Sequence, residues 1–329
     1  MRSLYESIST ISTELNTIST EDIPTEIKNL KYRGDNANFA ISLFQEYLIN
    51  PNIHLKNFIS NLGEEVFKWA DQNLHNGYEK MADVHHGTEL FIGFLPRYID
   101  LFPEDSRPKS LIIGAAEYIG NWRHGATQWY DYNNETFKSW HLGSLGFNKR
   151  KLFAYETADH IRFIHMALVA WKIGGDNKYF EWALKYGKNF AKKITESDEI
   201  IPVAWDHDGK RFYPENMKEK AEQFLASNHH HILEDPLSGV ENLIASGTIY
   251  AFGDLYNICQ ENIFKEAAKK IIIQLLMFLF CRPEKKVHLL LCWKLWHPVY
   301  LSSHQMYLAV VIFLEIFQIN YLLLKMYQN

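Results

Sequence analysis

The chain has 329 residues and a net charge of −5, and 47% of its residues are hydrophobic while 22% are charged. This composition excludes an intrinsically disordered chain and allows a large buried core. The acidic balance argues against nucleic acid as a partner, because phosphate binding normally shows as a basic domain or stripe.

The cysteines and the N-terminus restrict the chemistry and the compartment. Cys259, Cys281 and Cys292 have no C-x-x-C spacing and fall in or near apolar helical runs, so neither a zinc site nor a disulfide framework is expected. The opening residues, MRSLYESISTISTELN, lack the basic start and apolar stretch of a secretory signal. We therefore expect a cytoplasmic protein, or a periplasmic or secreted one if a leader was removed.

Apolar residues spaced at the helical period predict pairs of helices joined by short polar turns. A Ser/Thr-rich lead comes first. The expected pairs are then residues 39–49 with 55–74, 86–102 with 109–122, 158–174 with 179–194, and 238–259 with 263–281. In the third pair, Gly174 and Gly175 form the turn, because glycine at a helix end adopts the left-handed conformation that other residues resist.

The spacing of these pairs predicts the fold class. They recur every roughly 75 to 80 residues, which is longer than simple solenoid repeats because an extended excursion follows each pair. This favours an all-α fold, an α/α toroid of helical hairpins. Turn residues at Asn133-Asn134 and Asp208-Gly209 predict small β-hairpins at one mouth of the ring.

The C-terminal stretch differs in character from the rest. We expect residues 1–282 to form the toroid catalytic domain and residues 283–329 to form an apolar tail of separate origin. A membrane-spanning helix needs about 20 mostly apolar residues and would resist Glu315, Gln318 and Asn320, so membrane insertion is not expected. A buried terminal helix is favoured, and the alternative is an altered or truncated C-terminus that leaves the ring incomplete.

The first polar cluster is Asp83-Val84-His85-His86-Gly87, followed by Glu89, where a helix should start. A pocket histidine can act as base or acid because its ordinary pKa lies near neutrality. The alternative is a helix-capping Asp83 with incidental histidines.

The second cluster is the loop GNWRHGATQWYDYNNETFKSWHLGS. In the longer range from Gly120 to Arg162, six Lys and Arg residues stand against four Asp and Glu residues. Its aromatic rings can stack on pyranose rings, and its Asn and Arg side chains can hold hydroxyl or carboxylate groups. A mildly positive mouth suits an anionic ligand. The candidate binding residues in this loop are Asn121, Arg123, Trp129, Tyr130 and Trp140. The alternative is an aromatic plug that closes the end of the barrel.

The third cluster, Tyr155 to Arg162, contains Asp159 and His160 and again precedes a helix. In a toroid, the helix entrances near His86, His160 and Glu241 would share one face. The alternative is a capping Asp or Thr with Arg162 on the surface. The run His229-His230-His231 does not predict a metal site, because adjacent side chains diverge and no carboxylate has ligand spacing.

The segments ADVHHGTELFIGFLPRYIDL, GNWRHGATQWYDYNNETFKSWHLGSLG and ETADHIRFIHMALVAWKIGGDNKYFEWALKYG together resemble α/α-barrel polysaccharide lyases that act on uronate polymers such as alginate or glucuronan. The resemblance spans residues 75–273. It implies an acidic oligo- or polysaccharide substrate, no cofactor and no metal. It also implies His and Tyr as base and acid, with His, Asn or Arg neutralising the substrate carboxylate.

Carried onto this sequence, the resemblance gives His86 and His160 as candidate bases and Tyr130 as the candidate acid, with Tyr155 as an alternative acid or substrate contact. Arg162 and Asn121 would offset the charge that develops on the uronate carboxylate. Arg123, Glu89, Trp129 and Trp140 complete the expected substrate-binding set.

Three other functions remain open at the level of sequence. A glycoside hydrolase would use paired carboxylates, such as Asp83 with Asp159 or Glu156. A sugar epimerase would use two histidines across a cavity. An inactive carbohydrate-binding toroid would bind oligosaccharide without changing it.

Overall fold

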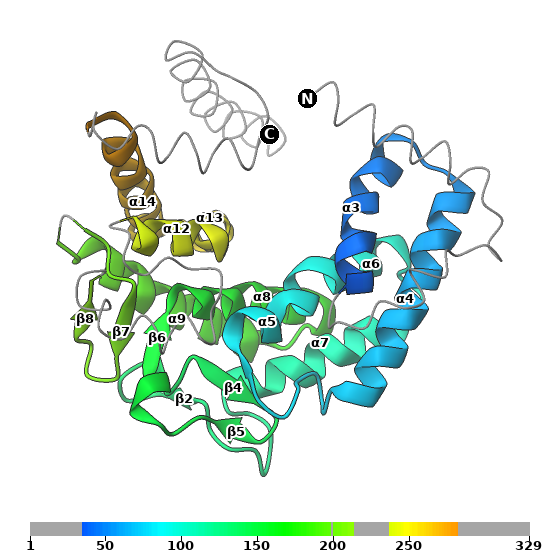
Figure 1. The fold of residues 1–329 in the computed structure, drawn as a ribbon, viewed down its shortest axis with the longest axis horizontal. Helices are drawn as coiled ribbons and strands as arrows, with labels where there is room; N and C mark the ends of the chain where they lie inside the picture. The colour runs from blue at the N-terminus through cyan, green and yellow to red at the C-terminus, as the bar shows by residue number, and fades with distance from the viewer. Residues whose placement is uncertain (1–34, 199, 214–236, 282–329) are drawn as a thin grey trace. The chain divides into compact units, whose positions relative to one another are not determined.

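The computed structural model describes residues 35–198, 200–213 and 237–281. Helices make up 64% of the structure and strands 10%, so the fold is largely all-α with small antiparallel sheets (Figure 1). The expectation of a mainly helical chain is confirmed. The apolar tail, the Ser/Thr-rich lead and the His229–His231 run lie outside the described residues. Up to Leu275, the described residues belong to one compact unit.

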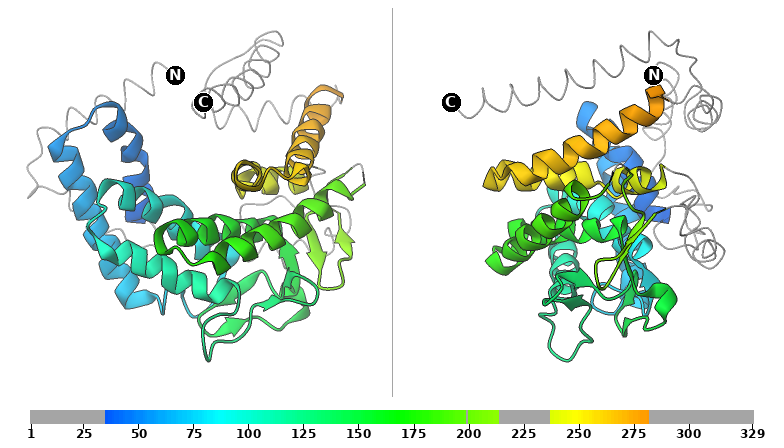
Figure 2. Two further views of the ribbon diagram at one scale, coloured as in Figure 1. Left: turned by 180° about the vertical axis from the view of Figure 1, so that it is seen from behind. Right: turned by 90° about the vertical axis from the view of Figure 1, so that its left-hand side faces the viewer.

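Most helices of this unit follow one another as hairpins, and the expected pairs 39–49 with 55–74 and 158–174 with 179–194 are present as α3 with α4 and α8 with α9. Neighbouring pairs touch, since α7 packs against α8 and α8 against α9, and these three helices run side by side in Figure 2. The bounds are α3 (Asp35–Ile49), α4 (Ile53–Asn73), α5 (Val84–Glu89), η1 (Leu90–Phe94), α6 (Leu95–Leu101), α7 (Ser106–Ile119), η2 (Lys151–Phe153), η3 (Ala158–Ile161), α8 (Arg162–Gly174), α9 (Asn177–Thr195), α12 (Ser238–Ala245), α13 (Thr248–Cys259) and α14 (Asn262–Cys281).

Two of the expected helices are interrupted. Residues 86–102 form α5, a π turn (η1) and α6, with a proline in the first turn of α6. Proline lacks an N–H and crowds the preceding turn, and a π turn accommodates one extra residue in a helix. Residues 238–259 are split into α12 and α13 at Gly247, whose φ of 74° is left-handed. Apolar periodicity continues across both breaks, which is why it predicted single helices.

Local capping sets where several helices begin and end. The side chains of Asn52, Asp83, Asp105 and Asp176 each accept a hydrogen bond from a backbone N–H in the first turn of α4, α5, α7 and α9, respectively. These bonds satisfy donors that a helix leaves unpaired at its start. Gly175 ends α8 in the left-handed conformation, with a φ of 71°, as the sequence predicts.

Three small antiparallel sheets connect the helical pairs. The expected hairpin at Asn133-Asn134 is β2–β3, and the one at Asp208-Gly209 is β7–β8. The sheets have the orders β1-β4-β5, β2-β3 and β6-β7-β8. The strands are β1 (Ala82–Asp83), β2 (Tyr130–Asp131), β3 (Thr136–Phe137), β4 (His141–Gly143), β5 (Gly146–Phe147), β6 (Tyr155–Thr157), β7 (Ala204–Asp206) and β8 (Arg211–Phe212).

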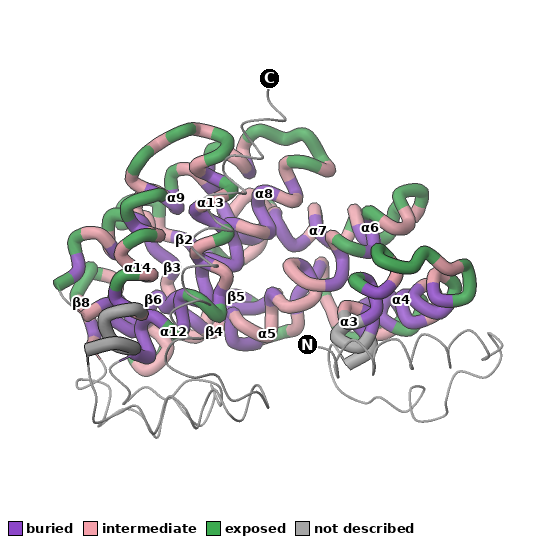
Figure 3. The backbone as a smooth tube through the Cα atoms, turned by 90° about the horizontal axis from the view of Figure 1, so that it is seen from above, coloured by how far each residue is buried: buried purple, intermediate pink, exposed green. Residues whose placement is uncertain are grey.

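One hydrophobic cluster joins the strands to the helices, and Figure 3 shows buried backbone along α7, α8 and the adjoining strands. Phe137 on β3 lies at its centre: its ring is 4.8 Å from Phe163 of α8 and 5.4 Å from Tyr186 of α9, measured between ring centroids. Strands of two or three residues make few ladder bonds, so this side-chain packing holds them in place. Among the described helices, none is both long and apolar enough to cross a membrane.

The break at Gly247 predicts that alanine substitutions at two glycines will change the free energy of unfolding by different amounts. Gly247→Ala should lower the free energy of unfolding by about 1–2 kcal/mol or more, because an L-residue resists the left-handed conformation. Its Cβ would also lie 2.9 Å from Nε2 of His165. Gly253→Ala, in α13 with no atom within 4 Å of the new Cβ, should be neutral or stabilising. Urea denaturation measures both, and equal effects would contradict the conformational explanation.

Candidate functional site

A cluster of charged side chains lies where three helix ends meet. Helix α5 and helix α12 both contact η3, the short turn that leads into α8. The entrances near His86 and His160 are therefore neighbours, and α12 meets them through its C-terminal end, at Ala245 and Ser246. The cluster comprises His85 and Glu89 from α5, Asp159 from η3, Arg162 from α8 and Ser246 from the end of α12.

His85 is the centre of this cluster. Its Nδ1 lies 3.3 Å from Oδ1 of Asp159, and its Nε2 lies 3.3 Å from Oε1 of Glu89, one helical turn along α5. Burial lowers the pKa of His85, but the hydrogen bonds to Asp159 and Glu89 outweigh that effect and raise the pKa to about 9. The imidazole is therefore cationic at neutral pH, and it also holds the pKa of Glu89 below its usual value despite burial, which acts in the opposite direction.

Arg162 is the second cation and is almost entirely buried. Its guanidinium contacts are long. Nη1 lies 3.3 Å from the carbonyl oxygen of His85, Nη2 lies 3.5 Å from the carbonyl oxygen of Ala245 and 3.4 Å from Nε2 of His85, and Nε lies 3.5 Å from Asp159. The contact of Nε with Asp159 is an ion pair and not a hydrogen bond, so Nε has no hydrogen-bond partner among the described residues. Burial lowers the pKa of the guanidinium. A guanidinium normally makes shorter, paired bonds, so this one retains capacity for a better acceptor.

His86 and Asp83 form a second pair at the edge of the cluster. Asp83 caps α5 with one carboxylate oxygen, which accepts the His86 N–H at 2.9 Å, and its other oxygen lies 2.7 Å from Nδ1 of His86. Strand β1 holds Asp83 opposite His141 on β4. The His86 side chain remains 26% exposed. An imidazole oriented by a carboxylate and reachable from solvent is equipped for proton transfer.

His160, a predicted base, occupies a structural position instead. It is 0% exposed, and both ring nitrogens face backbone groups. The Thr157 N–H donates to Nδ1 at 3.0 Å, and Nε2 lies 3.0 Å from the Ser139 carbonyl, which fits the neutral tautomer with hydrogen on Nε2. Burial lowers the pKa of His160, which agrees with that neutral form. An enclosed imidazole of this kind cannot reach a substrate.

The two tryptophans expected to line a groove are also interior residues. Trp129 is 0% exposed; its Nε1 donates to the Gly143 carbonyl at 3.2 Å, and its ring stacks on Tyr118 at 5.0 Å between centroids. Trp140 is 2% exposed, and its Nε1 donates to the Leu152 carbonyl. Neither indole presents a face to a sugar. The alternative of an aromatic plug describes these two residues better.

The remaining predicted residues divide between the core and the surface loops. Tyr130 is buried against Phe137, Trp182 and Tyr186, and burial raises the pKa of its phenol far above the usual value, which makes it a poor proton donor. Tyr155 is buried against Phe212. The Asn121 amide binds the backbone of Tyr130 at both N and O, and the Arg123 guanidinium lies over the Tyr118 ring. Of the predicted set, Glu89 and Arg162 join the His85 cluster, and His86 lies beside it.

The sequence placed His85 in the first polar cluster but did not assign it a role, although it lies at the centre of the site. His85 could have been found from its spacing with Glu89, because residues four apart share one face of a helix. Asp159 and Arg162 carry the analogous spacing of three. Ser246, whose hydroxyl donates to Asp159 at 3.1 Å, follows an unremarkable apolar stretch and carries no signal in the sequence.

Comparisons of this chain with models of known protein families, with characterised proteins and with solved structures give no match.

Burial predicts that Trp129 is a stability residue. Trp129→Ala should lower the free energy of unfolding by about 3–5 kcal/mol, the usual cost of truncating a buried aromatic side chain. Leu145→Ala, at a side chain that is 69% exposed, is the matched control and should change it by no more than about 0.5 kcal/mol. Thermal or urea unfolding would show both, and a small loss at Trp129 would return it to the set of exposed ligand contacts.

The neutral state of His160 predicts a pH effect on stability. Because its folded pKa lies below the ordinary 6.5, the unfolded chain binds the proton first, and stability is lost as the pH falls below about 6.5. In His160→Gln, the free energy of unfolding should be lower at neutral pH but should decline less steeply under acid. Urea titrations across this pH range measure both slopes. If the free energy of unfolding falls equally steeply with pH in the wild type and in His160→Gln, His160 is not the buried, neutral group whose protonation destabilises the fold.

Proposed function

We propose that this chain is an α/α-toroid polysaccharide lyase that cleaves a uronic-acid-containing polymer by β-elimination, with His86 as the base. The observation that carries the proposal is the 2.7 Å contact between His86 Nδ1 and Asp83, at a side chain that stays partly exposed beside the cationic His85. The resemblance of the segments around Asp83, Asn121 and Asp159 to uronate lyases adds the substrate class.

The reaction requires that a proton leave C5 of the uronate while negative charge grows on its carboxylate. His86 would accept this proton, and Asp83 would stabilise the imidazolium that forms. The electron pair of the C5–H bond becomes the C4–C5 double bond, and the bond from C4 to the glycosidic oxygen breaks. The imidazolium of His86 can then return its proton to that oxygen, which closes the cycle without the buried Tyr130.

Neutralisation of the substrate carboxylate would fall to His85, supported by Arg162. Glu89 is the more exposed of the two acids on His85, at 29% against 7% for Asp159. A substrate carboxylate can therefore replace Glu89 on the imidazolium while Asp159 holds the ring from the other side. A charge-assisted contact made as the enolate develops lowers the barrier more than one made equally to the ground state.

The hydrolase alternative is weaker because the carboxylates that it needs have other partners. Glu156 is buried and accepts a hydrogen bond from Tyr186 at 2.9 Å, while also pairing with Lys193. Asp159 is engaged by His85 and Ser246, and Asp83 by His86. A pair of carboxylates flanking a glycosidic bond is therefore not evident in the described part of the chain.

The test is incubation with alginate, glucuronan and polygalacturonate while the ultraviolet absorbance of the unsaturated product is followed. His86→Gln should lower the rate about a hundred- to ten-thousandfold, because Gln retains hydrogen bonding but cannot exchange the proton. His54→Gln, at an exposed position near the start of α4, is the matched control and should keep the wild-type rate.

Three outcomes would contradict the proposal. New reducing ends without absorbance would indicate a hydrolase, and interconversion of monosaccharides with intact polymer would indicate an epimerase. Elimination that persists in His86→Gln would remove His86 as the base.

A further inference from the structure

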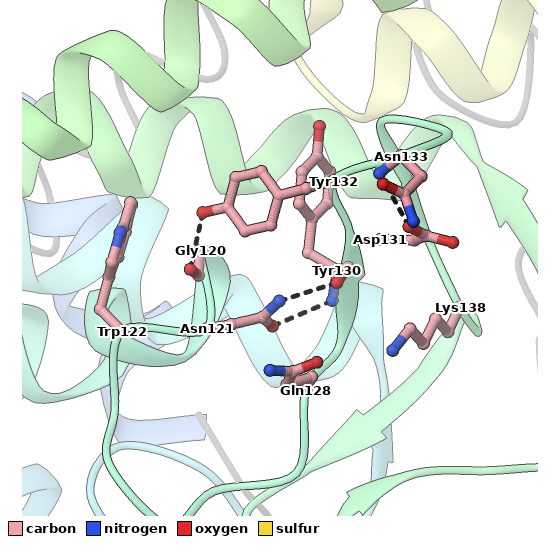
Figure 4. Close-up of a pocket in the computed structure, with 9 residues that line it drawn as sticks. All are labelled: Gly120, Asn121, Trp122, Gln128, Tyr130, Asp131, Tyr132, Asn133 and Lys138. Carbon is pink, nitrogen blue, oxygen red and sulfur yellow. Dashed lines mark hydrogen bonds between the residues drawn. The ribbon is translucent and has the colours of Figure 1, made fainter.

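A pocket of about 560 Å³ lies beside the β2–β3 hairpin, at the C-terminal end of α7 (Figure 4). Packed side chains lie between it and η3: the ring of Tyr130, which lines the pocket, lies 5.3 Å from that of Phe137, and the Phe137 ring lies 4.8 Å from that of the buried His160, measured between centroids. The pocket is therefore a site of its own.

Tyr132 provides an aromatic face at this pocket. It is 46% exposed, yet its hydroxyl donates to the Gly120 carbonyl at 2.7 Å, as Figure 4 shows. Its ring also meets that of Tyr130 edge to face at 5.0 Å. The ring is held in one orientation before any ligand arrives, so little conformational entropy is lost when a ligand stacks on it.

The backbone around the pocket is fixed as firmly. Both atoms of the Asn121 amide bind the Tyr130 backbone, and Asn121 itself has a left-handed φ of 58°. A Cβ on Gly120 would lie 2.3 Å from the Trp122 ring, so only glycine permits the indole to close this side of the pocket. These constraints fix the backbone and the indole that line this side of the pocket.

Three polar side chains of the lining, those of Gln128, Asn133 and Lys138, have unused hydrogen-bonding capacity among the described residues. Within the described ranges, neither the Gln128 amide nor the Lys138 ammonium forms a hydrogen bond or an ion pair; Lys138 makes only a ring contact with Phe147 at 5.6 Å. The acid of the lining, Asp131, is already paired with His207 at 2.8 Å and accepts the Asn133 N–H. The lining therefore offers the side-chain amides of Gln128 and Asn133 and one unpaired positive charge.

We propose that this pocket binds one unit of an acidic oligosaccharide, with the sugar ring on Tyr132, its hydroxyls on Gln128 and its carboxylate on Lys138. An exposed aromatic face, an amide and a lone cation around a cavity match the apolar ring faces, hydroxyls and single charge of a uronate. The inference rests on the proposed function for its ligand class, and it adds a binding site away from His86.

Isothermal titration of the purified chain with a glucuronate tetrasaccharide and with the matching neutral glucose tetrasaccharide tests this site. Tyr132→Ala should weaken binding of both about two- to tenfold, through loss of one aromatic contact. Lys138→Gln should weaken the acidic ligand alone and abolish the preference for it. Gln128→Ala should weaken both. Tyr250→Ala and Lys149→Gln, at exposed positions outside the pocket, are the matched controls and should bind as the wild type does.

The outcomes separate this site from the catalytic proposal. Binding that is unaffected by Tyr132→Ala and Lys138→Gln, or no binding of either saccharide, overturns the pocket assignment whether or not the chain eliminates uronate polymers. Tyr132-dependent binding without elimination supports the pocket and removes the lyase. If Tyr132→Ala does not fold, Tyr132→Phe and Gln128→Ala replace it, with Tyr132→Phe expected to retain stacking but to bind less tightly, because its ring is no longer held by Gly120.

Discussion

The hydrogen bonds of the buried His160 hold together the part of the molecule on which the candidate site depends. By bonding to Ser139 on one side and to Thr157 on the other, its ring fixes η3 against the segment that joins β3 to β4. The next side chain back, Asp159, then points to the opposite side of η3, where it meets His85 and Ser246. Of these two adjacent residues, His160 therefore holds η3 in place, and Asp159 binds the side chains of the charged cluster.

Much of the secondary structure could be predicted from the sequence because the features that determine it are local. Apolar periodicity located the helical pairs, the Asp and Asn caps and Gly175 set several ends, and the turn residues at Asn133-Asn134 and Asp208-Gly209 located two hairpins. The breaks at η1 and Gly247 were missed because apolar spacing continues through them. Whether the helical pairs close into a ring depends on contacts between distant segments, and that part stays a prediction.

The candidate site was harder to predict because residue type does not reveal burial. His86 and His160 look equivalent in sequence, each near an acid at a helix start, yet one is partly exposed and the other is enclosed. The aromatic residues of the 120–144 loop raised a similar difficulty. Most of them, Trp129 and Trp140 included, form the packing between short strands and helices, while Tyr132 stays at the surface. A strand of two residues cannot hold itself in place, so the loop needs its large rings as interior.

The π turn at Leu90–Phe94 makes the number of residues between α5 and α6 important, whatever those residues are. Each residue added to a helix rotates everything after it by about 100°. The extra residue of the turn therefore sets the rotational phase between α5, which presents His85 and Glu89 to the charged cluster, and α6, which presents Leu95 and Tyr98 to the core. Point substitutions leave that phase intact. Loss of a single residue here would misalign the two faces while leaving the chemistry of each side chain unchanged, so evolutionary tolerance in this stretch should be wider for replacements than for changes in length.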